Sequence, residues 1–357
     1  MKYVHSISST IFVPLILIVS LPFMACADED AQFEQIDRSY YETDVNSLIN
    51  IGSAADIAAR RQALIRYIWG GKGFPAQKLP AEVKQDIKDE RYAELFNAGL
   101  RQIDRITVNM DYGLESVIYH FIPKTPNNKL IIYHQGHRGD FIQGIDTIRA
   151  FIEKGCAVMA ISMPLLGMNN QPVVNLDGVG RFHITKHEHL KLLKNPISFF
   201  VEPIAVAINY ADKFKYDRIS MIGISGGGWT TTLYAAIDPR IKNSYPVAGS
   251  LPIYLRSDSQ RDWGDYEQTL PDLYHTANYL ELYVMGSYGT GRHQIQILNK
   301  YDSCCFAGIK YRTYEKVVRD IVAGLGEGNF EVSLDDTHKE HKISDEALKV
   351  VFVHEGL

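Results

Sequence analysis

The chain has 357 residues, with 37 Lys or Arg against 42 Asp or Glu, which gives a formal net charge of −5. Hydrophobic residues make up 46% and charged residues 22%, values that are typical of a globular protein and exclude a fibrous or wholly disordered chain. The slight acidity argues against a nucleic-acid binder, because such proteins usually carry a basic patch or stripe. Four cysteines are too few for a disulfide scaffold, so we expect a packed core to hold the fold.

The first 27 residues have the parts of a secretory signal peptide. A charged start with Lys2 and His5 precedes an apolar stretch over 11–24, and Ala25-Cys-Ala27 then offers a cleavage site. Two prolines interrupt the apolar stretch, which is short for a membrane span. We therefore expect cleavage near Ala27 and a secreted or periplasmic protein that is not an integral membrane protein. Attachment of a lipid at Cys26 is the alternative.

Residues 28–104 are predicted to form a helical N-terminal extension. Apolar residues recur at helical spacing over 54–69 and again over 83–100, and a glycine-rich segment at 70–75 separates the two stretches. We expect two helices that pack on the main domain.

Strands and helices alternate from residue 105 to the end of the chain. The first two strands flank the turn Asp111-Tyr-Gly113 and predict an antiparallel hairpin. Further strands are expected at 129–134, 156–162, 218–222, 243–247, 293–298 and 330–334, and helices at 142–153, 201–214, 229–237, 311–323 and 345–352. Continuous apolar strands between helices predict an α/β domain over 105–357, with a mostly parallel central sheet and helices on both faces. The segment 248–265 is loop-rich.

The strongest motif is Gly223-Ile-Ser225-Gly-Gly227, directly after the strand at 218–222 and at the start of a helix. In G-x-S-x-G the serine occupies a strained strand-to-helix turn, which exposes its hydroxyl and leaves free N–H groups at the helix start. A glycine-rich turn without a chemical role is the alternative. The strand before and the helix after the motif favour Ser225 as a nucleophile.

With this motif and this order of elements, residues 105–357 resemble the α/β-hydrolase superfamily and, within it, the serine esterases and lipases. The resemblance covers about 250 of the 357 residues and leaves the N-terminal extension outside. It implies the α/β-hydrolase fold and the chain order nucleophile, acid, histidine, with the last two on loops after later strands.

The candidate acid is Asp302, which lies a few residues after the strand at 293–298, in the position that the resemblance implies. Three other aspartates compete from an earlier, loop-like stretch: Asp258, Asp262 and Asp265. A carboxylate that only caps a turn is the alternative for Asp302.

The candidate base lies between the last strand and the last helix. Two histidines compete there. The resemblance implies a base just before the last helix, and His341 is preferred over His338 because it lies closer to Ser344, the expected cap of that helix. A metal site built from these histidines with Asp335 and Asp336 is a weaker hypothesis, because no third His/Cys cluster supports it.

The resemblance also implies an oxyanion hole in the loop after the strand at 129–134. Aligning Gly136 with the glycine of the family's His-Gly-x pattern makes the backbone N–H of His137 one donor, and the N–H of Gly226 the other. This sequence has Gln135 where the family usually has histidine, so the register stays open by a residue or two. A plain glycine turn is the alternative.

Other polar segments do not indicate a cofactor. His187 and His189 do not make an H-E-x-x-H site and are expected at the surface or with satisfied hydrogen bonds. The glycines at 324–328 lack the strand-before, helix-after context of a dinucleotide loop. We therefore expect neither a cofactor nor a metal. Cys304 and Cys305 form either a vicinal disulfide or two free thiols.

The sequence thus predicts an exported serine hydrolase that cleaves a small-molecule carboxylic ester. Ser225, His341 and Asp302 would act as a triad through an acyl-enzyme intermediate. A peptidase or thioesterase with the same triad, and a non-catalytic binding domain of the same fold, are the alternatives. The acyl and alcohol specificity and the oligomeric state do not follow from these residues.

Overall fold

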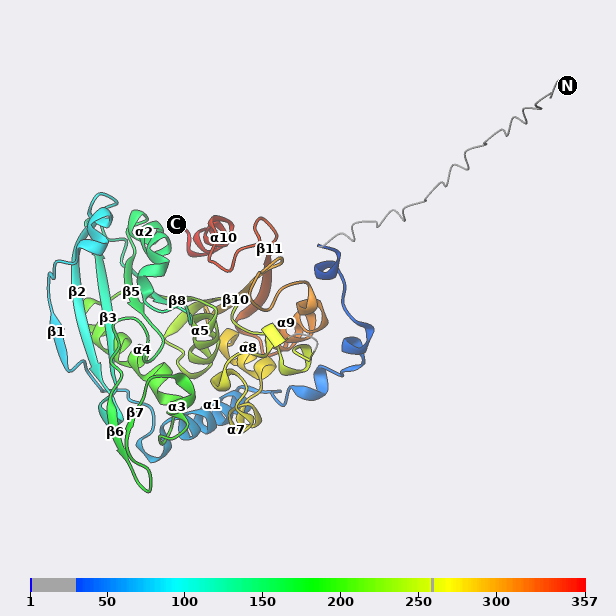
Figure 1. Cartoon of the computed structure of the whole chain (residues 1–357), viewed down its shortest axis with the longest axis horizontal. Helices are drawn as coiled ribbons and strands as arrows, with labels where there is room; N and C mark the ends of the chain where they lie inside the picture. Colours follow the sequence, from blue (N-terminus) through cyan, green and yellow to red (C-terminus); the bar gives the residue numbers. More distant parts are fainter. Residues whose placement is uncertain (2–29, 258–259) are drawn as a thin grey trace.

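The computed structural model describes Met1 and residues 30–257 and 260–357. The expected signal peptide and Asp258 therefore lie outside the described residues. Within these ranges nine strands form one sheet, in the order β1-β2-β3-β5-β4-β8-β9-β10-β11 (Figure 1). The strands are β1 (Glu82–Lys84), β2 (Leu100–Asn109), β3 (Glu115–Pro123), β4 (Lys129–His134), β5 (Ala157–Ile161), β8 (Arg218–Ile224), β9 (Ile241–Val247), β10 (His293–Asn299) and β11 (Asn329–Asp335).

The sheet is antiparallel at one edge and parallel through the rest. β2 pairs antiparallel with β1 and β3, and β3 pairs antiparallel with β5. From β5 through β4, β8, β9 and β10 to β11, every neighbouring pair is parallel. The predicted hairpin and the mostly parallel α/β sheet are both confirmed.

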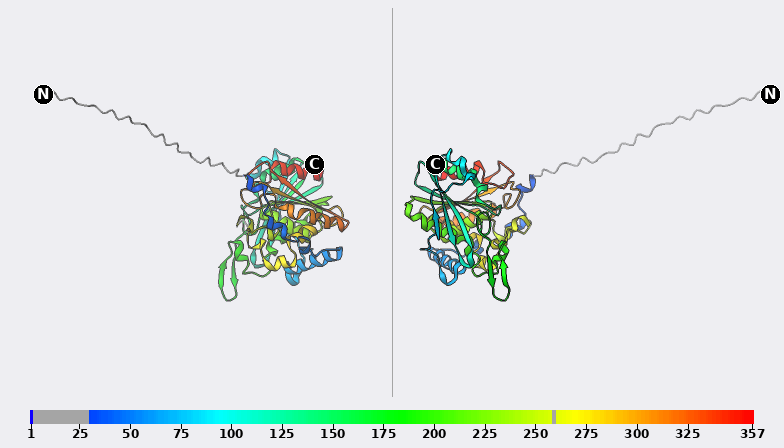
Figure 2. Two further views of the ribbon diagram at one scale, coloured as in Figure 1. Left: turned by 90° about the vertical axis from the view of Figure 1, so that its right-hand side faces the viewer. Right: turned by 60° about the vertical axis from the view of Figure 1, so that its left-hand side comes forward.

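Helices cover both faces of the sheet because its strands are apolar on both sides. Along β4, Leu130 and Ile132 belong to one buried cluster and Ile131 and Tyr133 to the other, as the two-residue period of a strand requires. The second cluster is completed by α2 (Ile145–Glu153) and α10 (Asp345–Glu355). The helices on the first face are α1 (Ala54–Trp69), α4 (Ser198–Ala211), α5 (Gly226–Ile237), α8 (Tyr279–Ser287) and α9 (Glu315–Gly324) (Figures 1 and 2).

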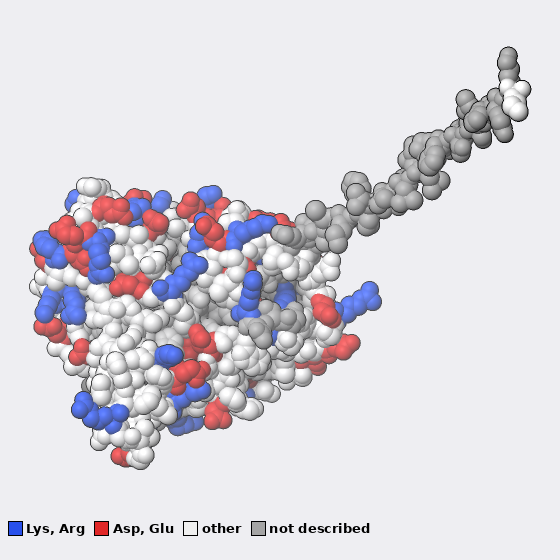
Figure 3. Space-filling view, viewed as in Figure 1, with Lys and Arg blue, Asp and Glu red and all other residues white. Residues whose placement is uncertain are grey.

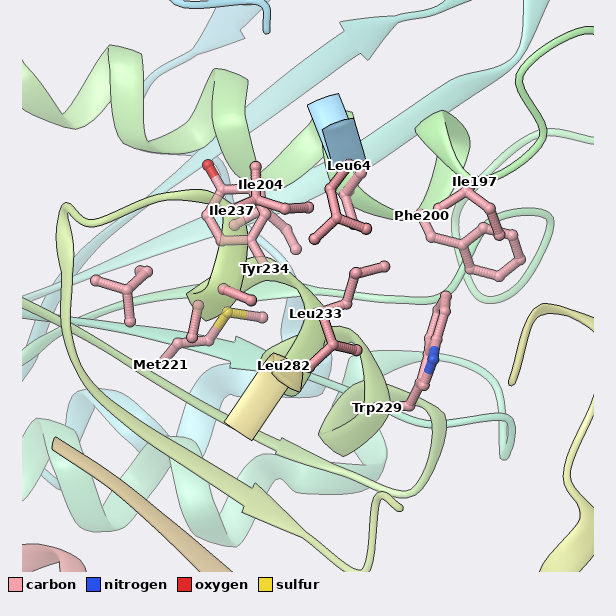
Figure 4. Close-up of a cluster of buried hydrophobic side chains, with 14 of the residues drawn as sticks. Leu64, Ile197, Phe200, Ile204, Met221, Trp229, Leu233, Tyr234, Ile237 and Leu282 are labelled. Carbon is pink, nitrogen blue, oxygen red and sulfur yellow. The ribbon is translucent and has the colours of Figure 1, made fainter. Parts of the chain in front are cut away.

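The packing around α5 holds the end of β8 in place. Figure 4 shows Trp229 and Leu233 of α5 among Leu64 of α1, Phe200 of α4 and Leu282 of α8. All five side chains are buried, and each contributes about 1.5–3 kcal/mol by leaving water. The first turn of α5, which follows Ser225, is thus fixed by core packing.

The predicted helix over 83–100 is wrong. Val83 in β1 pairs with Ile106 of β2, and a 3-10 helix at Glu90–Phe96 follows instead of an α-helix. Tyr92 and Leu95 in that 3-10 helix still pack into the core, which explains why the apolar spacing resembled an amphipathic helix. The domain boundary expected before residue 105 falls inside β2, and the division into an extension and a catalytic domain stays a prediction.

The chain contains two further segments, a hairpin and an insertion between two strands of the sheet. The hairpin of β6 (Val173–Leu176) and β7 (Gly180–His183) extends away from the body, and α3 (His187–Leu190) follows it (Figure 2). Between β9 and β10 lies an insertion, residues 248–292, with α6 (Gln260–Trp263), α7 (Pro271–Thr276) and α8.

Both signs of charge are interspersed over the face in Figure 3, which agrees with the near-balanced composition. In the described part of the chain, no helix is both long enough and apolar enough to cross a membrane.

Candidate active site

Ser225 lies in a strained turn between β8 and α5. Its backbone angles are φ 58° and ψ −125°, a left-handed conformation that costs a non-glycine residue about 1–3 kcal/mol. The turn is held because the Ser225 N–H donates to the carbonyl of Val247 (3.0 Å) and its own carbonyl accepts from the N–H of Trp229 (2.9 Å). A Cβ on Gly223 would lie 2.2 Å from the carbonyl oxygen of Gly227, so the motif requires glycine there. The predicted strand–turn–helix context is confirmed.

The loop after β4, residues 135–139, packs directly against this turn. A Cβ on Gly136 would lie 2.7 Å from Cβ of Ser225 and 3.3 Å from the backbone nitrogen of Gly226. Gly226 begins α5, where the first N–H groups have no intrahelical acceptor. Neither this N–H nor that of His137 has a hydrogen-bond acceptor among the described residues. Both N–H groups are thus available to a ligand beside Ser225, and their oxyanion role is a proposal.

Asp302 and His341 are hydrogen-bonded to each other. Nδ1 of His341 lies 2.9 and 2.8 Å from the two carboxylate oxygens of Asp302, and both residues are buried. Because a carboxylate only accepts, Nδ1 carries the proton, and the neutral ring has a lone pair on Nε2. That Nε2 has no hydrogen-bond partner among the described residues. His341 thus has the tautomer of a general base.

Three further donors hold the Asp302 carboxylate. The backbone N–H groups of Cys304 and Cys305 donate to Oδ1 at 2.7 and 3.1 Å, and Nδ2 of Asn299 donates to Oδ2 at 3.0 Å. Asn299 also donates to the carbonyl of Lys342, which links the loop after β10 to the loop that carries His341. These contacts hold the carboxylate of Asp302 in a fixed orientation toward His341.

Ser225 and His341 line one cavity of about 210 Å³, together with Gly136, His137 and Arg138. Ser225 follows β8, Asp302 follows β10 and His341 follows β11, so all three lie beyond the carboxyl ends of parallel strands. Ligands of open α/β sheets bind at this edge.

The alternate base, His338, lies elsewhere. Its Nε2 is 3.2 Å from Oδ2 of Asp335, and its ring lines a separate cavity beside α2 and α10. Asp335 also accepts from the hydroxyl of Ser344, which in turn accepts from the N–H of Ala347 and caps α10 as predicted. His338 therefore contacts Asp335, whereas His341 is hydrogen-bonded to Asp302. This arrangement does not support a metal site built from both histidines.

The competing acids are also engaged elsewhere. Asp262 accepts from Nζ of Lys310 (3.1 Å) and from the N–H of Phe306 (2.5 Å). Asp265 is 2.8 Å from Nε2 of His137. Of the described candidates, only Asp302 contacts His341.

Cys304 and Cys305 are free thiols with sulfur atoms 3.2 Å apart. A hydrogen bond from Cys305 lowers the pKa of Cys304 to about 6, against the effect of burial.

A second polar cluster, unexpected from the sequence, combines His137, His187, Asp265 and Glu267. Nε2 of His137 lies 2.8 Å from Asp265 and 2.9 Å from Glu267. Burial opposes the charged ring, but these carboxylates raise the pKa of His137 to about 9. His187 is hydrogen-bonded as expected, through Nε2 to the carbonyl of Pro164 (2.9 Å), but it lies inside this cluster.

Neither a protein-family model nor a curated protein matches this sequence. Solved structures do match. Acetyl xylan esterase 1 from Thermoanaerobacterium sp. JW/SL YS485 has a TM-score of 0.52 at 13% identity, over 90% of this chain and 99% of that one. An acetyl xylan esterase from Paenibacillus sp. R4 has a TM-score of 0.54 at 13% identity, over 87% and 98%. The methylesterase BT1017 has a TM-score of 0.53 at 15% identity, over 90% and 68%.

At these identities the likeness concerns the fold alone. The order of strands, the serine turn after β8 and these neighbours together define the α/β-hydrolase fold, which this protein has.

Proposed function

We propose that the protein is a carboxylic-ester hydrolase that acts through Ser225, His341 and Asp302. One observation carries the proposal: Asp302 holds the ring of His341, whose Nε2 has no hydrogen-bond partner among the described residues, and His341 lines the same cavity as the strained Ser225. This combination provides a nucleophile, a base and an orienting carboxylate, the roles that acyl transfer to serine requires.

In the proposed reaction, the hydroxyl of Ser225 attacks the acyl carbonyl while Nε2 of His341 accepts its proton. Asp302 keeps the ring in the required tautomer and stabilises the imidazolium that forms. The N–H groups of His137 and Gly226 stabilise the oxyanion, and each such donor typically contributes about 10²–10³ in rate. His341 then protonates the leaving alcohol, and water cleaves the acyl-enzyme with His341 again as base.

We further propose that the acyl group is short. The cavity at Ser225 has a volume of about 210 Å³, below the roughly 300 Å³ at which pockets for drug-sized ligands begin. The structural neighbours are named acetyl xylan esterase and methylesterase, which agrees with small ester groups. Export through the N-terminal signal sequence is part of the same proposal.

The test is a substrate profile of the chain beginning at Asp28. We expect p-nitrophenyl acetate to be cleaved with the highest kcat/KM, with a loss of at least about tenfold at eight acyl carbons, since the longer chain exceeds the cavity. The matched anilides should be inert, and Ser225→Ala should lack ester cleavage. Faster cleavage of amides or thioesters would favour the peptidase or thioesterase alternative. Inert esters throughout would favour the binding domain.

A further inference from the structure

The cluster of His137, His187, Asp265 and Glu267 joins three distant parts of the chain. His137 lies in the loop after β4, and His187 is the first residue of α3. Asp265 caps a 3-10 helix at Tyr266–Gln268 within the β9–β10 insertion, and Glu267 is the middle residue of that helix. The four side chains each offer one ligand atom, and these atoms all lie within 4.8 Å of one another.

Glu267 is a buried carboxylate without a permanent cation. Its side chain is 0% exposed, and the described part of the chain brings no lysine or arginine into ion-pair contact with it. Oε1 lies 2.9 Å from Nε2 of His137 and 3.5 Å from Nδ1 of His187, while Oε2 has no hydrogen-bond partner among the described residues. Burying an ionised carboxylate costs several kcal/mol unless a cation compensates.

The hydrogen bond of His187 also bears on how the charge of Glu267 is compensated. Nε2 of His187 must donate to the carbonyl of Pro164, since a carbonyl has no proton to give. If the second nitrogen, Nδ1, carries no proton, its lone pair faces Oε1 of Glu267. Two lone pairs at 3.5 Å repel unless a proton or a metal ion lies between them. Histidines that bind metals have this arrangement, with the other ring N–H donated to a backbone carbonyl.

We propose that His137, His187, Asp265 and Glu267 bind a zinc ion. Two imidazoles and two carboxylates are suitable ligands for zinc, and four protein ligands complete its tetrahedral shell. Bonds of 2.0–2.1 Å place tetrahedral ligand atoms about 3.3 Å apart, close to the 2.8, 2.9 and 3.5 Å found between these atoms. The two positive charges balance the two carboxylates. Asp265 is half exposed, which gives the ion a route from solvent.

The ion would tie the loop after β4 to α3 and to the β9–β10 insertion. The ring of His137 packs on Gly226, where a Cβ would lie 2.4 Å from Cε1, and the neighbouring Gly136 abuts Ser225. With all four positions filled by protein, the zinc has a structural role and leaves the serine chemistry unchanged. This proposal revises the expectation from the sequence that the protein binds no metal.

The test is zinc binding by the tag-free chain beginning at Asp28. Protein stripped with a strong chelator is titrated with zinc chloride in competition with a chromophoric chelator, and the bound zinc is counted by mass spectrometry. We expect one zinc per chain with a Kd of about 1 nM or tighter, and a higher melting temperature with zinc than without.

Two variants and one control assign the site. His187→Ala and Asp265→Asn should each weaken zinc binding at least about 100-fold, because a structural site needs all its ligands. Asp265→Asn keeps the shape of a half-exposed side chain, so it remains informative if His187→Ala fails to fold. His189→Ala, two residues along α3 and outside the cluster, should bind zinc like wild type. A stoichiometry below about one-tenth, or equal binding by wild type and both variants, would overturn the proposal and leave the histidines as protonated partners of the carboxylates.

Discussion

Replacing His341 by alanine removes the nitrogen that we expect to accept the proton of Ser225. The other histidine at the cavity, His137, directs its Nε2 at two carboxylates, so it is a poor substitute. Loss of a triad base without a substitute lowers turnover by about 10⁴–10⁶-fold, or about 5–8 kcal/mol in the barrier. The matched change is His338→Ala, which breaks the contact with Asp335 and the hydrogen bond that Nδ1 accepts from the N–H of Glu340, and it should cost about 1–2 kcal/mol of stability.

The assay compares initial rates of p-nitrophenyl acetate hydrolysis for wild type and the two variants. Circular dichroism and thermal unfolding come first, so that lost stability is not mistaken for lost chemistry. We expect His338→Ala to stay within about threefold of wild type while His341→Ala is nearly inactive. An inactive His338→Ala beside an active His341→Ala would make His338 the base. Activity in both would refute our interpretation of the loop between β11 and α10.

Two further predictions concern the loop after β4 and the buried histidines. Gly136→Ala should lower kcat for ester cleavage by at least about 100-fold, because the new Cβ would clash with Ser225 and displace the loop. The control is Gly71→Ala, whose methyl group would lie in open space and should leave kcat unchanged. Burial lowers the pKa of His120 to about 3 and that of His134 to about 4, below the unfolded value of about 6.5. Below pH 6.5 each of these histidines therefore binds a proton in the unfolded chain but not in the folded chain, and the free energy of unfolding should fall by about 3 kcal/mol between pH 6.5 and 5. Urea titrations would measure this loss, and a flat profile over that range would contradict the assignment of neutral buried rings.

The sheet could be predicted from the sequence because its strands are short apolar runs bounded by turns. β4 matches its predicted residues, and β8 and β10 each differ only at their carboxyl ends. The segment over 83–100 failed because its apolar spacing suits a helix as well as a strand followed by a 3-10 helix. Pairing of Val83 with Ile106 decided between them, and a contact of that kind has no local signal.

The sequence likewise predicted one part of the candidate site and missed another. Ser225 lies in a motif of five consecutive residues, and the family's chain order was enough to select Asp302 and to prefer His341. The contact between these two residues agrees with that choice, and their catalytic roles stay predictions. The cluster around Glu267 was missed because its members come from three separate segments and share no spacing in the sequence. Only the folded chain brings them together.

The central claim is that Ser225 is the nucleophile, and covalent labelling tests it most directly. The chain beginning at Asp28 is treated with a serine-directed phosphonate, digested and analysed by mass spectrometry, with Ser225→Ala as the control. We expect one adduct, on the peptide that contains Ser225, and none in the variant, because the strained turn exposes that hydroxyl beside a base. An adduct on another serine, or no adduct while esters are still cleaved, would contradict the account.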